Sequence, residues 1–491
     1  MDSEQNKPIN KTIKHYKHHD RKNKTLKKHE HASANASTSG KTGGKVIDSG
    51  GYGCIFKPGL KCKSREHRAK KSEISKLMLS HHATHEFNEI EKYKRLLEPI
   101  PKYSDYFLLN GITLCAPSKL TKSDLKQYKR KCRALQKRDI GKTNINESLD
   151  KLLSLNMPNG GEDIGNYLRN MNNSTRVNLN DLNESLIDLL NNGIVPMNNH
   201  NVYHCDVKES NILIKERKQT TYGLKLYTRL IDWGLSTEYD KTKEQTIPKA
   251  LSNRPFQYNL PFSVVLFNKR LHELYEGFLD ETPNPDYLLL SDFASDYITL
   301  WLKERGTGHF KVIDEIVNYM FDKDEQQGGG VKEDKKDKED DEYMNVKKYK
   351  RTYNYIRDYL TQILRKYTKS GELDLLDYFN NVFIKNVDIW GFVMSYLPIL
   401  EDLYFNYNKL NEHELKAFKK IKEIIVGFLF ETATDPIDVA DLTEELRELG
   451  ATFEKVAQNH PQNNDKTGEQ INDKNRKKTT STILTDTSAS I

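Results

Sequence analysis

The sequence predicts an α+β fold, with a small strand-rich part near the beginning and a larger helical part after it. Short apolar runs bounded by glycine and polar residues are typical of strands, and they gather between Val46 and Leu155. Stripes of apolar residues three or four positions apart are typical of helices. They first occur over 86–97 and dominate from 182 to 453. The 491 residues leave room for both parts and for insertions.

The net charge of +7 is concentrated at the N-terminus. Residues 1–44 hold ten Lys and Arg against four Asp and Glu, a balance of +6, with hardly any large apolar residues. Such a segment buries too little surface to offset its ordering entropy, so we expect a disordered basic tail there and a disordered polar tail over 459–491. The basic tail is suited to acidic surfaces, but the pattern predicts no specific nucleic acid partner.

The cysteines favour a reducing environment. They are few, odd in number and far apart: Cys54, Cys62, Cys115, Cys132 and Cys205. This distribution predicts neither a disulfide framework nor a zinc site. The longest apolar run, 424–430, is too short to cross a bilayer, and no apolar signal segment begins the chain. The expectation is an intracellular protein in a reducing compartment, without membrane contact.

A polar stretch between apolar flanks carries the strongest chemical signal. Residues 202–214 read V-Y-H-C-D-V-K-E-S-N-I-L-I, which places Asp206, Lys208 and Asn211 close together before an apolar strand. A carboxylate that accepts a hydroxyl proton, an ammonium near a moving phosphate and a metal-binding carboxamide are what phosphoryl transfer to an alcohol needs. His204 is interpreted as a structural hydrogen-bonding residue.

Three further patterns surround this stretch. Residues 46–58, V-I-D-S-G-G-Y-G-C-I-F-K-P, predict a strand–turn–strand hairpin whose glycines let the backbone close over phosphates. Residues 73–79, E-I-S-K-L-M-L, predict a strand with one inward lysine, Lys76, with Lys57 as the alternative. A D-W-G triplet begins at Asp232, behind an apolar pair.

In this order, the patterns resemble the motifs of the protein-kinase superfamily. H-C-D-V-K-E-S-N is similar to H-R-D-x-K-x-x-N, and D-W-G to D-F-G. The stretch N-V-D-I-W-G resembles the helix whose buried aspartate, here Asp388, anchors the catalytic loop. The phrases H-C-D-V-K and R-P-F-Q-Y-N-L-P-F-S, the latter over 254–263, most resemble divergent Ser/Thr kinases of giant nucleocytoplasmic DNA viruses of the mimivirus type. Two departures are Asp48 at the first glycine position and Phe262 for the A-P-E glutamate.

The resemblance implies a two-lobed protein-kinase-like fold, with a small β-rich N-lobe and a larger helical C-lobe that carries a long helical insertion. It implies ATP and Mg²⁺ (or Mn²⁺) as cofactors and proteins with a Ser or Thr acceptor as substrates. The implied catalytic residues are Asp206, Lys208 and Asn211, and the implied metal ligands are Asn211 and Asp232. The implied nucleotide-binding residues are Ser49, Gly50, Gly51, Tyr52, Gly53, Ile55, Lys76, Glu89 and Met157.

Some assignments stay open. Glu89 fits best as the partner of Lys76, and Glu86, one turn earlier, is nearly as good. Glu162 or Asp163 is expected at the ribose. The expected domains are an N-lobe over 45–157 with a basic helical insertion at 118–150, and a C-lobe over 158–458. The C-lobe contains an insertion over 263–385 that is disordered at about 322–345.

Three functional interpretations are compatible with the sequence. An active Ser/Thr protein kinase is favoured by the intact set of Lys76, Asp206, Asn211 and Asp232. A pseudokinase scaffold is supported by Asp48 and Phe262. A small-molecule kinase of the same fold is disfavoured by Lys208, which such enzymes usually lack.

Overall fold

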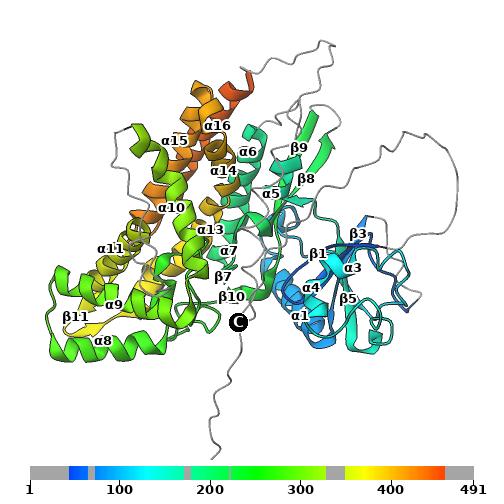
Figure 1. Ribbon diagram of the computed structural model, residues 1–491, viewed down its shortest axis with the longest axis horizontal. Helices are drawn as coiled ribbons and strands as arrows, with labels where there is room; N and C mark the ends of the chain where they lie inside the picture. Colours follow the sequence, from blue (N-terminus) through cyan, green and yellow to red (C-terminus); the bar gives the residue numbers. More distant parts are fainter. Residues whose placement is uncertain (1–43, 65–71, 171–178, 220–222, 328–348, 459–491) are drawn as a thin grey trace, which may run out of the picture. The chain divides into compact units, whose positions relative to one another are not determined.

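The computed structural model describes residues 44–64, 72–170, 179–219, 223–327 and 349–458. The predicted tails lie outside this part of the chain, except for Gly44, and so do residues 328–345 of the predicted loop. Within it, strands are concentrated early and helices late, so the predicted α+β class is confirmed (Figure 1). No helix in the described ranges is both long and apolar enough to cross a membrane.

A five-stranded antiparallel sheet, in the order β1-β2-β3-β5-β4, forms the strand-rich part. Its strands are β1 (Lys45–Ser49), β2 (Gly53–Lys57), β3 (Glu73–Leu79), β4 (Thr113–Cys115) and β5 (Leu152–Pro158). The predicted glycine hairpin is β1–β2, and β3 is the predicted lysine strand. Helix α1 (Ser80–Leu97) starts directly after β3 and buries Ile90, Tyr93 and Leu97 among the core residues.

The basic insertion over 118–150 is much less helical than predicted. It holds two four-residue helices, α3 (Tyr128–Lys131) and α4 (Arg133–Gln136), and is otherwise mostly turns. Cations cluster at 129–131 and 133, and like charges this close disfavour a longer helix. The segment instead packs Tyr128, Leu135 and Ile145 into a second core against β2 and β3.

Four of the five cysteines pair, so the prediction of no disulfides is wrong. Cys54 on β2 is bonded to Cys132 in the insertion, and Cys62 is bonded to Cys115 on β4. The paired Cα atoms lie 5.2 and 5.7 Å apart although 78 and 53 residues separate them in sequence. The expectation of a reducing compartment thereby loses its basis. Cys205 is free and buried.

Short strands join the sheet region to the helices. A three-stranded sheet has the order β6-β8-β9, and β7 pairs with β10. These strands are β6 (Glu162–Asp163), β7 (Val202–Tyr203), β8 (Ile212–Gln219), β9 (Gly223–Leu230) and β10 (Thr237–Glu238). A further hairpin joins β11 (Thr368–Lys369) and β12 (Glu372–Leu373).

Helices make up most of the described chain after β5, in the green to red part of Figure 1. The short helix α2 (Tyr103–Tyr106) precedes β4, and α5 (Ile164–Asn170), α6 (Leu179–Leu189) and α7 (Val195–Asn199) lead to β7. The insertion over 263–385 begins with α8 (Lys269–Glu281), α9 (Tyr287–Arg305), α10 (Gly308–Gln327), α11 (Lys350–Tyr367) and α12 (Leu375–Tyr378). The last helices are α13 (Ile384–Met394), α14 (Leu397–Phe405), α15 (Glu412–Ile425) and α16 (Val439–Gln458).

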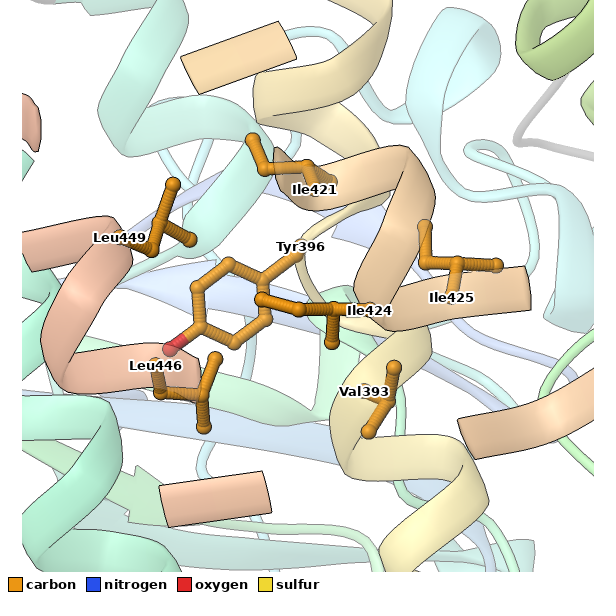
Figure 2. Close-up of a pocket in the computed structure, with 7 residues that line it drawn as sticks. All are labelled: Val393, Tyr396, Ile421, Ile424, Ile425, Leu446 and Leu449. Carbon is orange, nitrogen blue, oxygen red and sulfur yellow. The ribbon is translucent and has the colours of Figure 1, made fainter. Parts of the chain in front are cut away.

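An apolar crevice lies between α13, α15 and α16 (Figure 2). Isoleucine and leucine side chains surround the ring of Tyr396, whose hydroxyl donates to Asn183 Oδ1 at 2.8 Å. Apart from this tyrosine, no ionisable side chain lines the crevice. It is therefore part of the helical core rather than a site for chemistry.

We predict that Cys132→Ser destabilises the protein, because the Cys54–Cys132 bond restricts the unfolded chain. The loop-entropy relation gives a loss of about 4.5 kcal/mol for a sequence separation of 78 residues. Denaturant unfolding under oxidising conditions measures the effect. The control is the same comparison in excess thiol, where wild type and variant should coincide. Equal stability under oxidising conditions would show that the bond contributes nothing.

Candidate active site

A buried carboxylate on α13 holds the polar stretch that the sequence singled out. Asp388, fully buried, accepts hydrogen bonds from the backbone N–H groups of His204 and Cys205, both at 2.8 Å. Cys205 has a left-handed φ of 56°, which costs a non-glycine residue free energy and needs outside support. Burial raises the pKa of Asp388 to about 7, and the two N–H donors oppose this shift. The contact predicted from N-V-D-I-W-G is thus present.

Two neighbours of Asp388 extend this support. A Cβ at Gly391 would lie 2.3 Å from the carbonyl oxygen of Val207, so only glycine lets the helix approach the loop so closely. The indole Nε1 of Trp390 donates to the carbonyl of Tyr258 at 2.9 Å. Helix α13 therefore holds both the 202–211 loop and the 254–262 segment.

Asp206 is the centre of a dense set of donors. Lys208 Nζ lies 2.9 and 3.2 Å from its two carboxylate oxygens. Asn211 Nδ2 donates to the backbone oxygen of Asp206 at 2.9 Å and to Asp206 Oδ2 at 3.0 Å. Asn259 Nδ2 donates to Asp206 Oδ1 at 3.0 Å. Arg254 Nη2 is 4.0 Å from Oδ1. The carboxylate is thereby fixed in orientation, with its predicted partners Lys208 and Asn211 in direct contact.

His204 has the structural role expected of it. Its Nε2 bonds the carbonyl of Ile231 at 3.0 Å, and because a carbonyl only accepts, Nε2 carries the proton. Burial lowers the pKa of His204, so the ring is neutral. Its ring centroid lies 5.0 Å from that of Trp233. The histidine thus links the loop to the D-W-G turn.

Asp232 begins that turn with a left-handed φ of 68°. The next residue, Trp233, is buried and packs 5.4 Å from Tyr93 of α1 and 5.6 Å from Phe107, measured between ring centroids. Tryptophan thus provides the aromatic packing expected where the related motif has phenylalanine. The buried ring fixes the turn from which the Asp232 carboxylate projects.

Lys76 on β3 is paired with Glu86, not with the predicted Glu89. Its Nζ lies 2.8 and 2.7 Å from the two Glu86 carboxylate oxygens. Burial lowers the pKa of Lys76, but Glu86 and Asp232 outweigh burial, so the net shift is upward. Glu86 lies in the second turn of α1, near the end of the lysine strand. Glu89 is one turn further along and interacts with the Tyr93 hydroxyl instead.

The nucleotide-binding residues predicted in the glycine hairpin differ in their surroundings. Ile55 is opposite Lys76 in the β2–β3 register, as a shared site requires. A Cβ at Gly53 would lie 2.8 Å from the carbonyl oxygen of Leu77, so this glycine is needed for packing. Ser49 Oγ accepts from the backbone N–H groups of Arg133 and Ala134 at 3.1 and 3.0 Å, which ties it to the insertion.

In the described ranges, the remaining predicted residues form no side-chain hydrogen bond or ion pair with Asp206 or Lys76, although Tyr52 interacts electrostatically with Lys76. Gly50 and Gly51 are exposed at the hairpin tip. Tyr52, also exposed, has its ring centroid 4.5 Å from that of His82. Met157 on β5 is half-buried and pairs with Ile74 rather than Lys76.

Arg254 and Asn259 are not among the site residues predicted from the sequence, and Glu86 was not the preferred partner of Lys76. The first two belong to the quoted R-P-F-Q-Y-N-L-P-F-S stretch, but no periodicity marks which of its polar side chains point inward. Spacing along α1 favoured Glu89 by one turn. Because α1 starts immediately after β3, its second turn, which carries Glu86, is the turn that reaches Lys76.

The arrangement combines an oriented carboxylate next to an ammonium with two oxygen-bearing side chains. Asn211 uses Nδ2 on Asp206, which leaves its Oδ1 as a ligand atom, and Asp232 lies within electrostatic range of Lys76. Such oxygens suit Mg²⁺ rather than softer metals. The described residues contain no cluster of three or more His, Cys, Asp or Glu side chains that could hold a metal ion.

No protein-family model matches the chain, and no curated protein matches it. Function is therefore inferred from the side chains and their contacts.

We predict that Glu86→Gln lowers the pKa of Lys76, because the buried ammonium loses its nearest carboxylate. Lys76 should then react faster with an amine-acylating reagent at mildly alkaline pH, as measured by mass spectrometry of its peptide. Glu89→Gln is the matched control and should leave this rate unchanged. Faster reaction in the control alone would restore Glu89 as the partner.

Proposed function

We propose that the chain is an ATP-dependent serine/threonine protein kinase. The observation that carries the proposal is the Asp206 cluster. Lys208 and Asn211 lie within 3.2 Å of Asp206, on a loop that Asp388 holds through two consecutive backbone amides. Proton acceptance, charge neutralisation and metal binding are thereby concentrated within one short segment.

The proposal includes a kinase-like arrangement of two lobes. The five-stranded sheet with α1 corresponds to the small lobe, and the helical part to the large lobe. Phe262, which departs from the kinase pattern, lies in an aromatic cluster. Its ring centroid is 5.5 Å from Tyr359, 5.1 Å from Trp390 and 5.3 Å from Phe430. Apolar packing here replaces the anchoring that a glutamate would give, so the departure does not argue for an inactive scaffold.

On the nucleotide side, Lys76 would bind phosphate oxygens while Glu86 holds its ammonium in place. Asn211 Oδ1 and Asp232 would hold the divalent cation. Magnesium-bound ATP supplies the γ-phosphoryl group, and the cation neutralises the charge that develops on it. The oxygen-only ligand set and the nearby Lys76 fit this group.

On the acceptor side, the hydroxyl oxygen of a Ser or Thr residue attacks the γ-phosphorus, and Asp206 accepts the proton of that hydroxyl. The bond between phosphorus and the ADP oxygen breaks, and the proton stays on the Asp206 carboxylate. Lys208, 2.9 Å from Asp206 Oδ2, provides positive charge beside the transferring group. Orientation and electrostatics supply most of the catalysis in such a step.

Two alternatives share this fold: a pseudokinase and a small-molecule kinase. The contacts of Lys208 with Asp206 favour a protein acceptor, in line with the Ser/Thr-type lysine of the motif. A viral kinase could act in the host cytoplasm or be carried in the virus particle, and the two disulfides favour the particle. The resemblance to kinases of giant DNA viruses belongs to the same proposal.

We predict that Asp206→Asn abolishes phosphoryl transfer while nucleotide binding survives, because asparagine keeps the shape but accepts no proton. Loss of a positioned base costs on the order of 1000-fold in rate. Transfer of label from γ-labelled ATP is measured to generic protein and small-molecule acceptors, beside the affinity for an ATP analogue. Asp280→Asn, on the exposed face of α8, is the control.

The outcomes separate the alternatives. Label on protein acceptors supports the proposal, and label on small molecules alone supports the second alternative. Nucleotide binding by the wild type without any transfer supports the pseudokinase. Near-normal transfer by Asp206→Asn would remove this residue from the catalytic role.

We predict that Asp232→Ala removes the metal-dependent part of ATP binding, because the phosphate charge is left uncompensated. In the wild type, ATP with Mg²⁺ at one hundred times its dissociation constant should add about 2.7 kcal/mol of stability. Thermal unfolding with ATP alone, Mg²⁺ alone and both measures this. Stabilisation by ATP that is equal with and without metal would contradict the assignment.

A further inference from the structure

Arg254 is a buried cation next to the reacting carboxylate. The residue is 2% exposed, and its Nη2 lies 4.0 Å from Asp206 Oδ1. Nη1 donates to the carbonyl of Cys205 at 2.6 Å, and Nε and Nη2 donate to Gln257 Oε1 at 3.0 and 2.6 Å. A guanidinium this deep is strongly destabilising unless it is hydrogen-bonded and close to negative charge.

The negative charge around Arg254 comes from the site itself. Among the described residues, Asp206 is its only ion-pair partner within 4.0 Å. Burial lowers the pKa of Arg254, and Asp206, Cys205 and Asp388 act against this. A guanidinium stays protonated in proteins, so the positive charge is permanent.

Arg254 also connects two segments that meet at Asp206. Its bond to the Cys205 carbonyl holds the strained residue immediately before Asp206, while Asn259, five residues after Arg254, donates to Asp206 Oδ1. Phe256 between them is buried and lies 5.9 Å from Phe310 of α10, between ring centroids. The 254–259 segment is thereby held against the inserted helices as well as the loop.

We propose that Arg254 is a positioning residue for Asp206. It joins the 254–259 segment to the loop and places a fixed positive charge beside the carboxylate. Lys208, by contrast, is partly exposed and faces the transferring group. This inference rests on the proposed function for its kinetic consequence, but its structural part stands apart from it.

The kinetic test compares Arg254→Met, Arg254→Lys and the control Arg270→Met, whose arginine lies on the exposed face of α8. A misplaced catalytic group costs about 100-fold in rate. We expect kcat to fall about that far in Arg254→Met, while KM for ATP stays within about twofold, because Asp206 does not bind the nucleotide. Arg254→Lys should recover part of the rate, since lysine restores the charge without the planar fork.

The structural test measures hydrogen exchange, by mass spectrometry, of the peptide covering 202–211. Exchange should accelerate in Arg254→Met and stay at the wild-type rate in Arg270→Met, with residues 384–394 unchanged in both. This exchange measurement does not require the protein to be catalytically active. If the wild type transfers no phosphate, the proposed function fails, and the exchange data still decide the role of Arg254.

A second variant covers the case in which Arg254→Met does not fold. Gln257→Ala removes the acceptor that holds two of the guanidinium nitrogens while leaving the charge in place. It should show the same pattern at smaller amplitude: lower kcat, unchanged KM for ATP and faster exchange over 202–211. Unchanged exchange in the folded Arg254→Met or in Gln257→Ala would overturn the proposal, as would an equal change in kcat and KM for ATP.

Discussion

The carboxylate of Asp388 is the contact on which the rest of the site depends. It sits fully buried and satisfies two consecutive amides, His204 and Cys205, just before Asp206. Without it, two buried N–H groups would lack acceptors, at a cost of about 1–3 kcal/mol each. Cys205 would also lose support for its left-handed backbone. Gly391 on the same helix lets the backbone of Val207 approach closely. The contacts of Asp388 with the loop therefore also require a residue without a side chain at position 391.

The features predicted correctly from the sequence are those that a short segment of the chain determines by itself. The spacing of Asp206, Lys208 and Asn211 puts them in one loop, and the structure shows them in direct contact. Alternation around Lys76 predicted the inward-facing strand lysine, and the glycine run predicted the β1–β2 hairpin. Each of these features is fixed within about a dozen residues, where strand period and turn chemistry decide the outcome.

Apart from the choice between Glu86 and Glu89, the features that sequence reasoning missed depend on distant parts of the chain. The partners of the two disulfides are 78 and 53 residues apart, and nothing in the spacing of Cys54 and Cys132 reveals that the insertion folds onto β2. Arg254 belongs to a stretch without periodicity, and its burial follows from the contacts of Phe256 with Phe310 and of Tyr258 with Trp390, both of which involve distant helices. The helical insertion predicted over 118–150 is mostly turns with two short helices, because like charges at 129–133 disfavour a longer helix and the segment buries Tyr128 against the sheet.

Helix α1 couples the sheet to the turn that begins at Asp232. Glu86 near its start holds Lys76, while Tyr93 near its end donates to the carbonyl of Ser236 at 2.6 Å and stacks on Trp233. Asp232 adds an electrostatic interaction with Lys76 across the same space. A shift of α1 would therefore disturb the lysine, its glutamate partner and the Asp232 turn together. Arg254 lies beside Asp206, and Asp388 holds the two residues before it, so the nucleotide half of the proposed site depends on α1 and the acceptor half on α13. The Asp232 turn, linked to α1 through Trp233 and to His204 of the loop through Ile231, is the structural connection between the two halves.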